Sequence, residues 1–305
     1  MSELLLSTNG LTKQYGHHKA VDKVNLHIKK GAIYGFIGRN GAGKTTCLKM
    51  ISGLARPTAG EIEMFGCKGK ELERIRSRVG CLIEAPGLYG NMNAYTNLKI
   101  KCELFGIRKK GYIEDILETV GLEGVGKKKT KHFSLGMKQR LGIGLALVGE
   151  PDLLVLDEPI NGLDPQGIAE VRDTIQRLRD ERNMTILISS HILEELSKIA
   201  TDYGIIHNGS LLQELTSEEL MKRCSERIEI ELIHPEQAVP ILDRMGFTNY
   251  QVTDKEHIHI FERLNESAAL NMELAKSGIP VKGISITSEE LETYFLNLTG
   301  GADHA

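Results

Sequence analysis

The fold is decided by the stretch Ala32-Ile-Tyr-Gly-Phe-Ile37, which runs directly into Gly38-Arg39-Asn40-Gly41-Ala42-Gly43-Lys44-Thr45. The first six residues are a short apolar run of the kind that forms a strand buried on both faces of a parallel sheet. The glycines that follow let the backbone curl so that successive N–H groups point inward. A helix is predicted after them, and its N-terminus adds a partial positive charge. The stretch therefore predicts a strand, a phosphate-binding loop and a helix.

The loop fits the P-loop pattern in every fixed position. Lys44 is expected to reach the β- and γ-phosphates of a nucleotide, and the Thr45 hydroxyl to be a Mg²⁺ ligand. We expect the whole segment from Gly38 to Thr46 to contact the nucleotide. A chance glycine-rich turn is disfavoured by the Lys-Thr pair in this strand-to-helix context. A P-loop alone does not name the reaction, because kinases, GTPases and transport ATPases all use it.

Two adjacent acids, Asp157 and Glu158, end a second apolar run that begins at Leu153. Two carboxylates at the end of a buried strand cost stability unless something uses them. Asp157 belongs beside the Mg²⁺, and Glu158 stands where it can orient or deprotonate a water that attacks the γ-phosphate. A surface turn is the alternative, and the P-loop disfavours it because it independently requires a metal-binding acid.

Further motifs surround these two in a fixed order: Phe133-Ser134-Leu135-Gly136-Met137-Lys138-Gln139-Arg140, Gly162-Leu163-Asp164-Pro165, His191 and Tyr15. They resemble, respectively, the signature sequence, the D-loop, the switch histidine and the adenine-stacking aromatic residue of the ABC ATPases. The resemblance covers about Leu4 to Leu215. Several motifs in the right order are far more specific than any one of them alone.

The resemblance implies an ATPase whose hydrolysis of ATP is coupled to transport across a membrane. Two such subunits would hold two ATP molecules between them, head to tail. Ser134 and Gly136 would donate hydrogen bonds to the γ-phosphate across the dimer, with the following helix aimed at it. His191 would sense loss of the γ-phosphate, Asp164 would shape the dimer contact, and Tyr15 would stack on adenine.

Each of these residues also has a purely structural reading. Tyr15 alone is better read as a core or surface aromatic residue. His191 can cap the end of a strand, and Ser134 can be an ordinary helix N-cap, which is compatible with its functional role. The order of the whole set favours function for each.

The sequence departs from the family at Glu84, where glutamine is usual, in the position that links the active site to the membrane partner. A glutamate there can still ligate Mg²⁺ or hold a water, so we count Glu84 among the catalytic and metal-binding residues. Leu135, Met137 and Ile160 are also unusual, and none removes a group that the chemistry requires. Glu84 with the following Ala-Pro-Gly-Leu-Tyr, the signature and the segment Leu291-Glu-Thr-Tyr-Phe295 resemble the bacitracin-resistance and lantibiotic-immunity exporters. Export of such a peptide antibiotic is therefore expected.

Composition sets further limits. The chain has 305 residues, a formal net charge of −3 and 41% hydrophobic residues. No strong basic field indicates nucleic acid as a partner, and no apolar run approaches the roughly 18 residues that span a bilayer. The start has no basic lead-in, so we expect no secretory signal, and the five cysteines are expected to be free thiols. Together with these limits, the resemblance to the ABC ATPases implies a peripheral protein at the cytoplasmic face of the membrane, bound to a separate transmembrane permease.

Strand and helix patterns divide the chain into an ATPase domain over residues 1–215 and an accessory domain over 216–305. The first is expected to be α/β, a RecA-like P-loop sheet core with strands at 32–37, 79–83, 153–156 and 185–188. A helical subdomain is expected over about 91–149, with helices at 95–105 and 113–120. In the second domain the expected order of elements is β-α-β-β-α-β plus a last helix, which is the ferredoxin-like pattern. The strands are expected at 227–233, 250–253, 257–261 and 281–286, and the helices at 236–245, 266–276 and 288–298.

Two other functions remain open from the residues. A soluble ABC-type ATPase acting on ribosomes or DNA is disfavoured, because those proteins carry two ATPase halves or a long coiled coil and this chain has one P-loop and no sustained heptads. A regulatory module that binds ATP without hydrolysing it is disfavoured by Glu158 and His191. His257 and His259 alternate on one strand face, where solvated histidines are more common than a metal site. The run Lys127-Lys-Lys-Thr-Lys131 is best read as a solvated loop.

Overall fold

The computed structural model describes residues 3–287 and 291–299. The chain divides into two compact units, Met1–Ser217 and Glu218–Ala305. A six-stranded sheet with the order β11-β10-β4-β9-β8-β7 forms the centre of the first unit. Its strands are β4 (Ile33–Ile37), β7 (Val79–Leu82), β8 (Leu153–Asp157), β9 (Thr185–Ser190), β10 (Asp202–His207) and β11 (Ser210–Thr216). All neighbours in it are parallel except β10 and β11, which confirms the predicted α/β class and the four predicted strands.

The central strands of this sheet are buried on both faces. Every residue of β4, β8 and β9 is buried, as expected for apolar runs in a parallel sheet with both faces covered. β9 pairs with β4 on one side and β8 on the other. Because parallel strands end at the same edge of a sheet, the residues that follow β4, β8 and β9 meet there.

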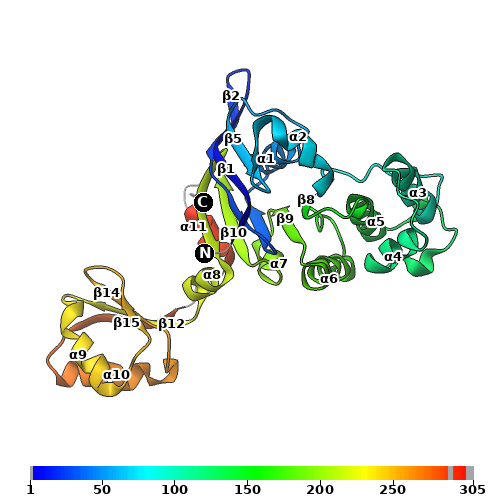
Figure 1. Cartoon of the computed structure of the whole chain (residues 1–305). Helices are drawn as coiled ribbons and strands as arrows, with labels where there is room; N and C mark the ends of the chain where they lie inside the picture. The colour runs from blue at the N-terminus through cyan, green and yellow to red at the C-terminus, as the bar shows by residue number, and fades with distance from the viewer. Residues whose placement is uncertain (1–2, 288–290, 300–305) are drawn as a thin grey trace. The chain divides into compact units, whose positions relative to one another are not determined.

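The described part of the first unit contains seven helices: α1 (Lys44–Ile51), α2 (Leu72–Ile75), α3 (Ala94–Leu104), α4 (Tyr112–Thr119), α5 (Leu135–Leu147), α6 (Pro165–Arg182) and α7 (Leu193–Ser197). Helix α8 (Ser217–Cys224) lies at the division between the units. Figure 1 shows α3, α4 and α5 grouped at one end of the first unit. The predicted helices at 95–105 and 113–120 are confirmed as α3 and α4. Asn93 begins α3 by accepting a hydrogen bond from the Thr96 N–H at 2.8 Å, a side-chain N-cap.

A second, antiparallel sheet in the first unit was not anticipated from the sequence. It has the order β2-β1-β5-β6, with β3 paired to β1. Its strands are β1 (Leu4–Tyr15), β2 (His18–Val24), β3 (His27–Lys29), β5 (Ala59–Met64) and β6 (Cys67–Lys68). Register shifts in the pairings of β1 with β2, β3 and β5 interrupt the two-residue alternation by which such strands are recognised.

The second unit has one four-stranded antiparallel sheet, in the order β13-β14-β12-β15. Its elements follow the chain as β12 (Arg227–Leu232), α9 (Val239–Met245), β13 (Tyr250–Val252), β14 (His257–Ile260), α10 (Ser267–Lys276), β15 (Val281–Thr287) and α11 (Leu291–Leu298). This sequence of elements agrees with the predicted β-α-β-β-α-β pattern followed by a helix. The predicted start of the last helix, at residues 288–290, lies outside the described residues.

Burial on the sheet of the second unit alternates. Ile228, Ile230 and Leu232 of β12 are buried in a core with Ile258 and Ile260 of β14. The intervening residues of β12 are partly exposed. The predicted helix at 236–245 begins later, at Val239, because Pro235–Gln237 forms a separate 3₁₀ turn.

Candidate functional site

The glycine-rich loop between β4 and α1 forms a tight backbone curl. Gly43 has φ +105°, and a Cβ there would lie 2.4 Å from the carbonyl oxygen of Ala20. Only glycine fits this position, both in conformation and in space. The N–H of Gly38 donates to the carbonyl of Ser190 at 3.3 Å, so the start of the loop is tied to the end of β9.

Lys44, the first residue of α1, turns its side chain back into the loop. Its Nζ donates to the carbonyl oxygens of Gly38 at 2.6 Å and Arg39 at 3.3 Å, and the residue is only 5% exposed. The carboxylate of Glu158 lies 3.1 Å from the same Nζ, but Glu158 Oε1 accepts no aligned hydrogen bond. The loop therefore surrounds a buried cation that has capacity for a further anionic partner.

Asp157 connects the loop to the ends of β8 and β9. Its Oδ2 accepts a hydrogen bond from the Thr45 hydroxyl at 2.9 Å, and its Oδ1 accepts one from the Ser189 hydroxyl at 2.6 Å. Ser189 stands directly opposite Asp157 in the pairing of β8 with β9. Both oxygens of the buried Asp157 carboxylate are thus oriented by hydroxyl donors.

Glu158 lies just past the end of β8 in a left-handed conformation, with φ +48°. Its N–H donates to Ser189 Oγ at 2.9 Å, and its Oε2 lies 2.9 Å from Nδ1 of His191. A non-glycine residue held at positive φ is strained and persists only where its surroundings fix it. The backbone and carboxylate of Glu158 are fixed by two residues of the neighbouring strand and its end.

Glu84, two residues beyond β7, also has positive φ, at +65°. Its Oε1 accepts a hydrogen bond from Lys49 Nζ at 2.5 Å. Within the described part of the chain, no hydrogen bond joins Glu84 to Thr45 or Asp157. The Glu84 carboxylate raises the pKa of Lys49, and the nearby Asp157 carboxylate acts in the same direction. Lys49 therefore lies between Glu84 and the loop site.

Tyr15, Ser134 and Asp164 occupy three separate positions. Tyr15 ends β1 with its ring 52% exposed, and Lys13 Nζ lies 5.1 Å from the ring centre. Ser134 caps α5, accepting from the Met137 N–H at 3.2 Å. Asp164 caps α6 in the same way, through the Gly167 N–H at 3.1 Å.

The structure thus brings together five of the expected site residues: Lys44, Thr45, Asp157, Glu158 and His191. Arg39, Asn40 and Gly41 are exposed in the loop beside them. Tyr15, Glu84, Ser134, Gly136 and Asp164 make no hydrogen bond or ion pair with this group among the described residues. Sequence reasoning missed Ser189 and Lys49, although Ser189 had one signal, a hydroxyl at the end of a run that is otherwise apolar.

Two further features were considered from the sequence: a metal site at His257 and His259, and helices that span a membrane. In the second unit, His257 Nδ1 lies 3.0 Å from Asp254, whose carboxylate raises the pKa of that histidine. Burial, and secondarily Arg227, lowers the pKa of His259. Across residues 3–287 and 291–299 there is no group of three or more His, Cys, Asp or Glu side chains arranged to hold a metal. Within the same ranges, none of the helices is both long enough and apolar enough to cross a bilayer.

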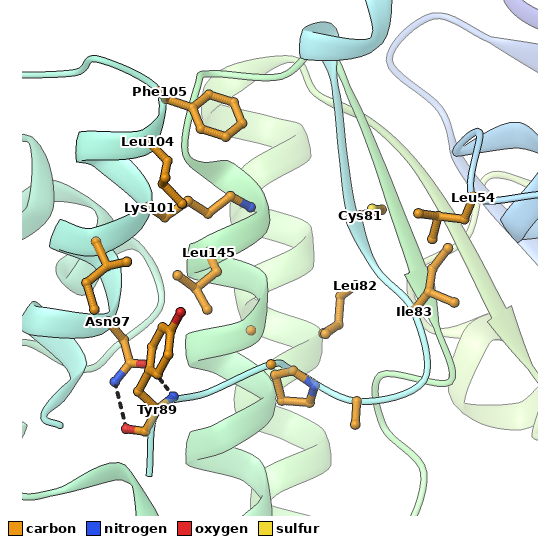
Figure 2. A pocket seen from close by; sticks show the side chains of 15 residues that line it. Leu54, Cys81, Leu82, Ile83, Tyr89, Asn97, Lys101, Leu104, Phe105 and Leu145 are labelled. Atoms are coloured by element: carbon orange, nitrogen blue, oxygen red, sulfur yellow. Dashed lines mark hydrogen bonds between the residues drawn. The ribbon is translucent and has the colours of Figure 1, made fainter. Parts of the chain in front are cut away.

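An apolar groove lies beside Glu84, with a volume of about 390 Å³. Its walls come from β7 and the segment after it, from α3 and the turn after it, and from α5 (Figure 2). The lining residues are Leu54, Cys81, Leu82, Ile83, Ala85, Pro86, Gly87, Tyr89, Asn97, Ile100, Lys101, Leu104, Phe105, Gly142 and Leu145. Ile83 and Ala85 flank Glu84 in the chain, so one short segment connects the groove with the ion pair at Lys49.

Comparison with known proteins agrees with this site. The profile of the ABC transporter family matches residues 21–161. The chain is 45% identical to the bacitracin transport ATP-binding protein BcrA of Bacillus licheniformis, over 97% of this chain and 98% of that protein. It is 44% identical to the lantibiotic transport ATP-binding protein SrtF of Streptococcus pyogenes, over 69% and 90%. A solved ATP-binding subunit of an ABC transporter is similar with a TM-score of 0.63 and 29% identity, over 72% of this chain and 92% of that chain.

Proposed function

The chain belongs to the family of ABC transporter ATP-binding proteins, and from this premise we propose that it powers export of a bacitracin- or lantibiotic-like peptide antibiotic. The family membership confirms the resemblance that the motifs indicated. The protein is an ATPase that works with a membrane permease. The substrate class is supported by the names of its relatives, which transport bacitracin and a lantibiotic. The convergence of Lys44, Asp157 and Glu158 at one sheet edge is the observation that carries the ATPase chemistry.

In the proposed site, each residue has a separate task. Lys44 binds the β- and γ-phosphates, for which its buried ammonium is already positioned by the loop carbonyls. Glu158 accepts the proton of the attacking water, and His191 holds the free end of the Glu158 carboxylate in place. The segment from Gly38 to Thr46 surrounds the phosphates, and the exposed ring of Tyr15 stacks on adenine.

The same site fits Mg²⁺. Thr45 and Asp157 supply a hydroxyl and a carboxylate that already contact each other, and oxygen donors are what this hard cation prefers. We assign the metal to these two residues, with Glu84 as a third ligand once its carboxylate leaves Lys49. The ion would neutralise charge on the phosphates.

We further propose that two copies close on two ATP molecules. Ser134 and Gly136 lie at the N-terminus of α5, a 13-residue helix whose N-terminal end favours an anion. Ser134 is exposed, and within the described residues it makes no hydrogen bond with the Lys44 group of its own chain. A γ-phosphate bound at Lys44 of one copy would meet Ser134 and Gly136 of the other, with Asp164 at the contact.

We propose that the permease binds this protein in the apolar groove. The protein is then held at the cytoplasmic face of the membrane as a peripheral subunit. Large apolar side chains such as Leu104, 81% exposed, and Leu54 are presented there without cover, and an exposed apolar groove is typical of a protein interaction site. We assign the nucleotide-binding function to residues 1–215, with residues 91–149 as the helical subdomain. Residues 216–305 are assigned to an accessory domain.

The proposed substrate class is tested in a strain that lacks this chain. The strain is expected to be several-fold more sensitive to bacitracin or a lantibiotic, measured as the minimum inhibitory concentration, because the drug is no longer exported. Wild-type protein should restore resistance, whereas Glu158→Gln should not. Unchanged sensitivity to all tested peptide antibiotics would refute the substrate class and leave the ATPase assignment intact.

Glu84→Gln tests the role of the unusual glutamate. In this pair Lys49 is 33% and Glu84 65% exposed, and exposed pairs contribute only about 0–1 kcal/mol. The free energy of unfolding should therefore fall by at most about 1 kcal/mol, and ATP affinity should change by less than about fivefold. Coupling between ATP hydrolysis and transport should change, because the substitution removes the carboxylate charge that pairs with Lys49 and thereby links the groove segment to the loop site. The measurement is the ratio of resistance to ATPase rate.

The matched control for this variant is Glu63→Gln, which removes another exposed lysine pair, that with Lys68 at 3.0 Å on the second sheet. It should leave the ratio unchanged. If Glu84→Gln alters neither resistance nor ATPase rate, Glu84 is only a tolerated variant of glutamine.

A further inference from the structure

One lysine stands inside the apolar groove. Lys101 is on α3, and Figure 2 shows its side chain extending from that helix toward the wall that carries Cys81. Of the 15 lining residues, the others are apolar or uncharged at neutral pH, and none is a carboxylate. Lys101 is therefore the sole permanent charge among the residues that form this groove.

The ammonium of Lys101 has no anionic partner. No hydrogen bond or ion pair of its Nζ is found with any residue in 3–287 or 291–299, and its nearest aromatic contact is the ring of Phe105, 5.7 Å away. Burial lowers the pKa of Lys101, and neighbouring Cys81 and Cys102 oppose this only in part. The charge is therefore already poorly hydrated before anything covers the groove.

A partner that covers the groove removes the remaining water from this ammonium. Burying an unpaired charge against an apolar surface is strongly unfavourable, whereas pairing it with a carboxylate offsets much of that cost. The groove thus selects for a partner surface that is apolar around one negative charge.

We propose that the permease segment that binds this groove is an apolar segment carrying one acidic side chain, which pairs with Lys101. This inference rests on the proposed docking of the permease in the groove. Lys101 is then a specificity-determining residue for the partner. A permease that presents only apolar groups to Lys101 would bind this subunit weakly.

The test measures affinity of the full-length chain for its co-expressed permease in detergent. Lys101→Glu is expected to weaken binding by about tenfold or more and Lys101→Met by several-fold, because an interfacial charge pair is lost, whereas Lys101→Arg should stay within about threefold. Lys70→Glu is the matched control, since it makes the same charge change at an exposed lysine that lies outside α3 and does not line the groove. All variants should keep the melting temperature and ATPase rate of the isolated subunit.

A charge reversal identifies the acidic partner. Acidic residues in the cytoplasmic segments of the permease are changed one at a time to lysine, and one of these changes should restore binding of Lys101→Glu. The inference is overturned if Lys101→Met binds as tightly as wild type and no reversal restores Lys101→Glu. A separate variant, Leu104→Glu, tests the docking itself. If Leu104→Glu loses binding to the permease while the Lys101 variants bind normally, only the acidic partner is refuted. If Leu104→Glu binds the permease as tightly as wild type, docking in the groove is refuted.

Discussion

Lys44→Ala is expected to lower the affinity for ATP by about a hundredfold or more and to abolish hydrolysis. The loop holds the ammonium between the carbonyls of Gly38 and Arg39, with 5% of the residue exposed. Nothing else in the loop supplies a full positive charge at that point. Charge-assisted hydrogen bonds contribute about 1.5–3 kcal/mol each, so loss of the contacts to two phosphates gives at least this decrease.

The measurement is binding of a fluorescent ATP analogue together with phosphate release. Lys68→Ala is the matched control, because it removes the same charge from an exposed position on the second sheet and should change neither quantity. Melting curves show whether the variant is folded. Folded Lys44→Ala protein that binds ATP as tightly as wild type would show that the loop is not the phosphate site.

Glu158→Gln is expected to reduce ATP hydrolysis by about 10²–10⁴-fold, the usual contribution of a general base, while ATP binding is kept or tightened. Glutamine has nearly the same shape but cannot accept the proton. It also removes a negative charge 3.1 Å from Lys44, where the γ-phosphate would otherwise meet a carboxylate. ATP should therefore stay bound and hold two copies together.

Size-exclusion chromatography with ATP and Mg²⁺ checks this result. Glu158→Gln should elute as a dimer, and wild type as a monomer once its ATP is hydrolysed. Glu194→Gln, an exposed change on α7 just beyond His191, should behave as wild type. Full turnover by Glu158→Gln would exclude this residue as the base, and a monomer with bound ATP would contradict the two-copy arrangement.

Much of the first unit could be predicted from short apolar runs. The strands at β4, β8 and β9 are buried on both faces, so their sequences are continuous apolar runs, which are easy to recognise. The antiparallel sheet was missed for the opposite reason, because β1 changes register against each of its neighbours. In the second unit, the regular alternation of β12 made both the strand and its core face predictable.

The residues of the candidate site also differ in how far the sequence could predict them. Lys44, Asp157 and Glu158 were identified because each belongs to a motif of adjacent residues. Ser189 and Lys49 belong to no motif, and their roles depend on neighbours more than thirty positions away, Asp157 and Glu84 respectively. The order of residues along the chain does not show which distant residues come into contact.

The sequence by itself predicted which residues bind and split a nucleotide, because the glycine pattern of the loop and the chemistry of Lys44 and Glu158 are local properties. Only the tertiary structure decided how they are oriented: parallel pairing of β8 with β9 places Ser189 against Asp157, and the ends of both strands fix Glu158 with His191. It also decided that Lys101 lies in an apolar groove without a counter-charge. Burial and charge pairing arise between segments that are distant in the chain, and they exist only once the chain has folded.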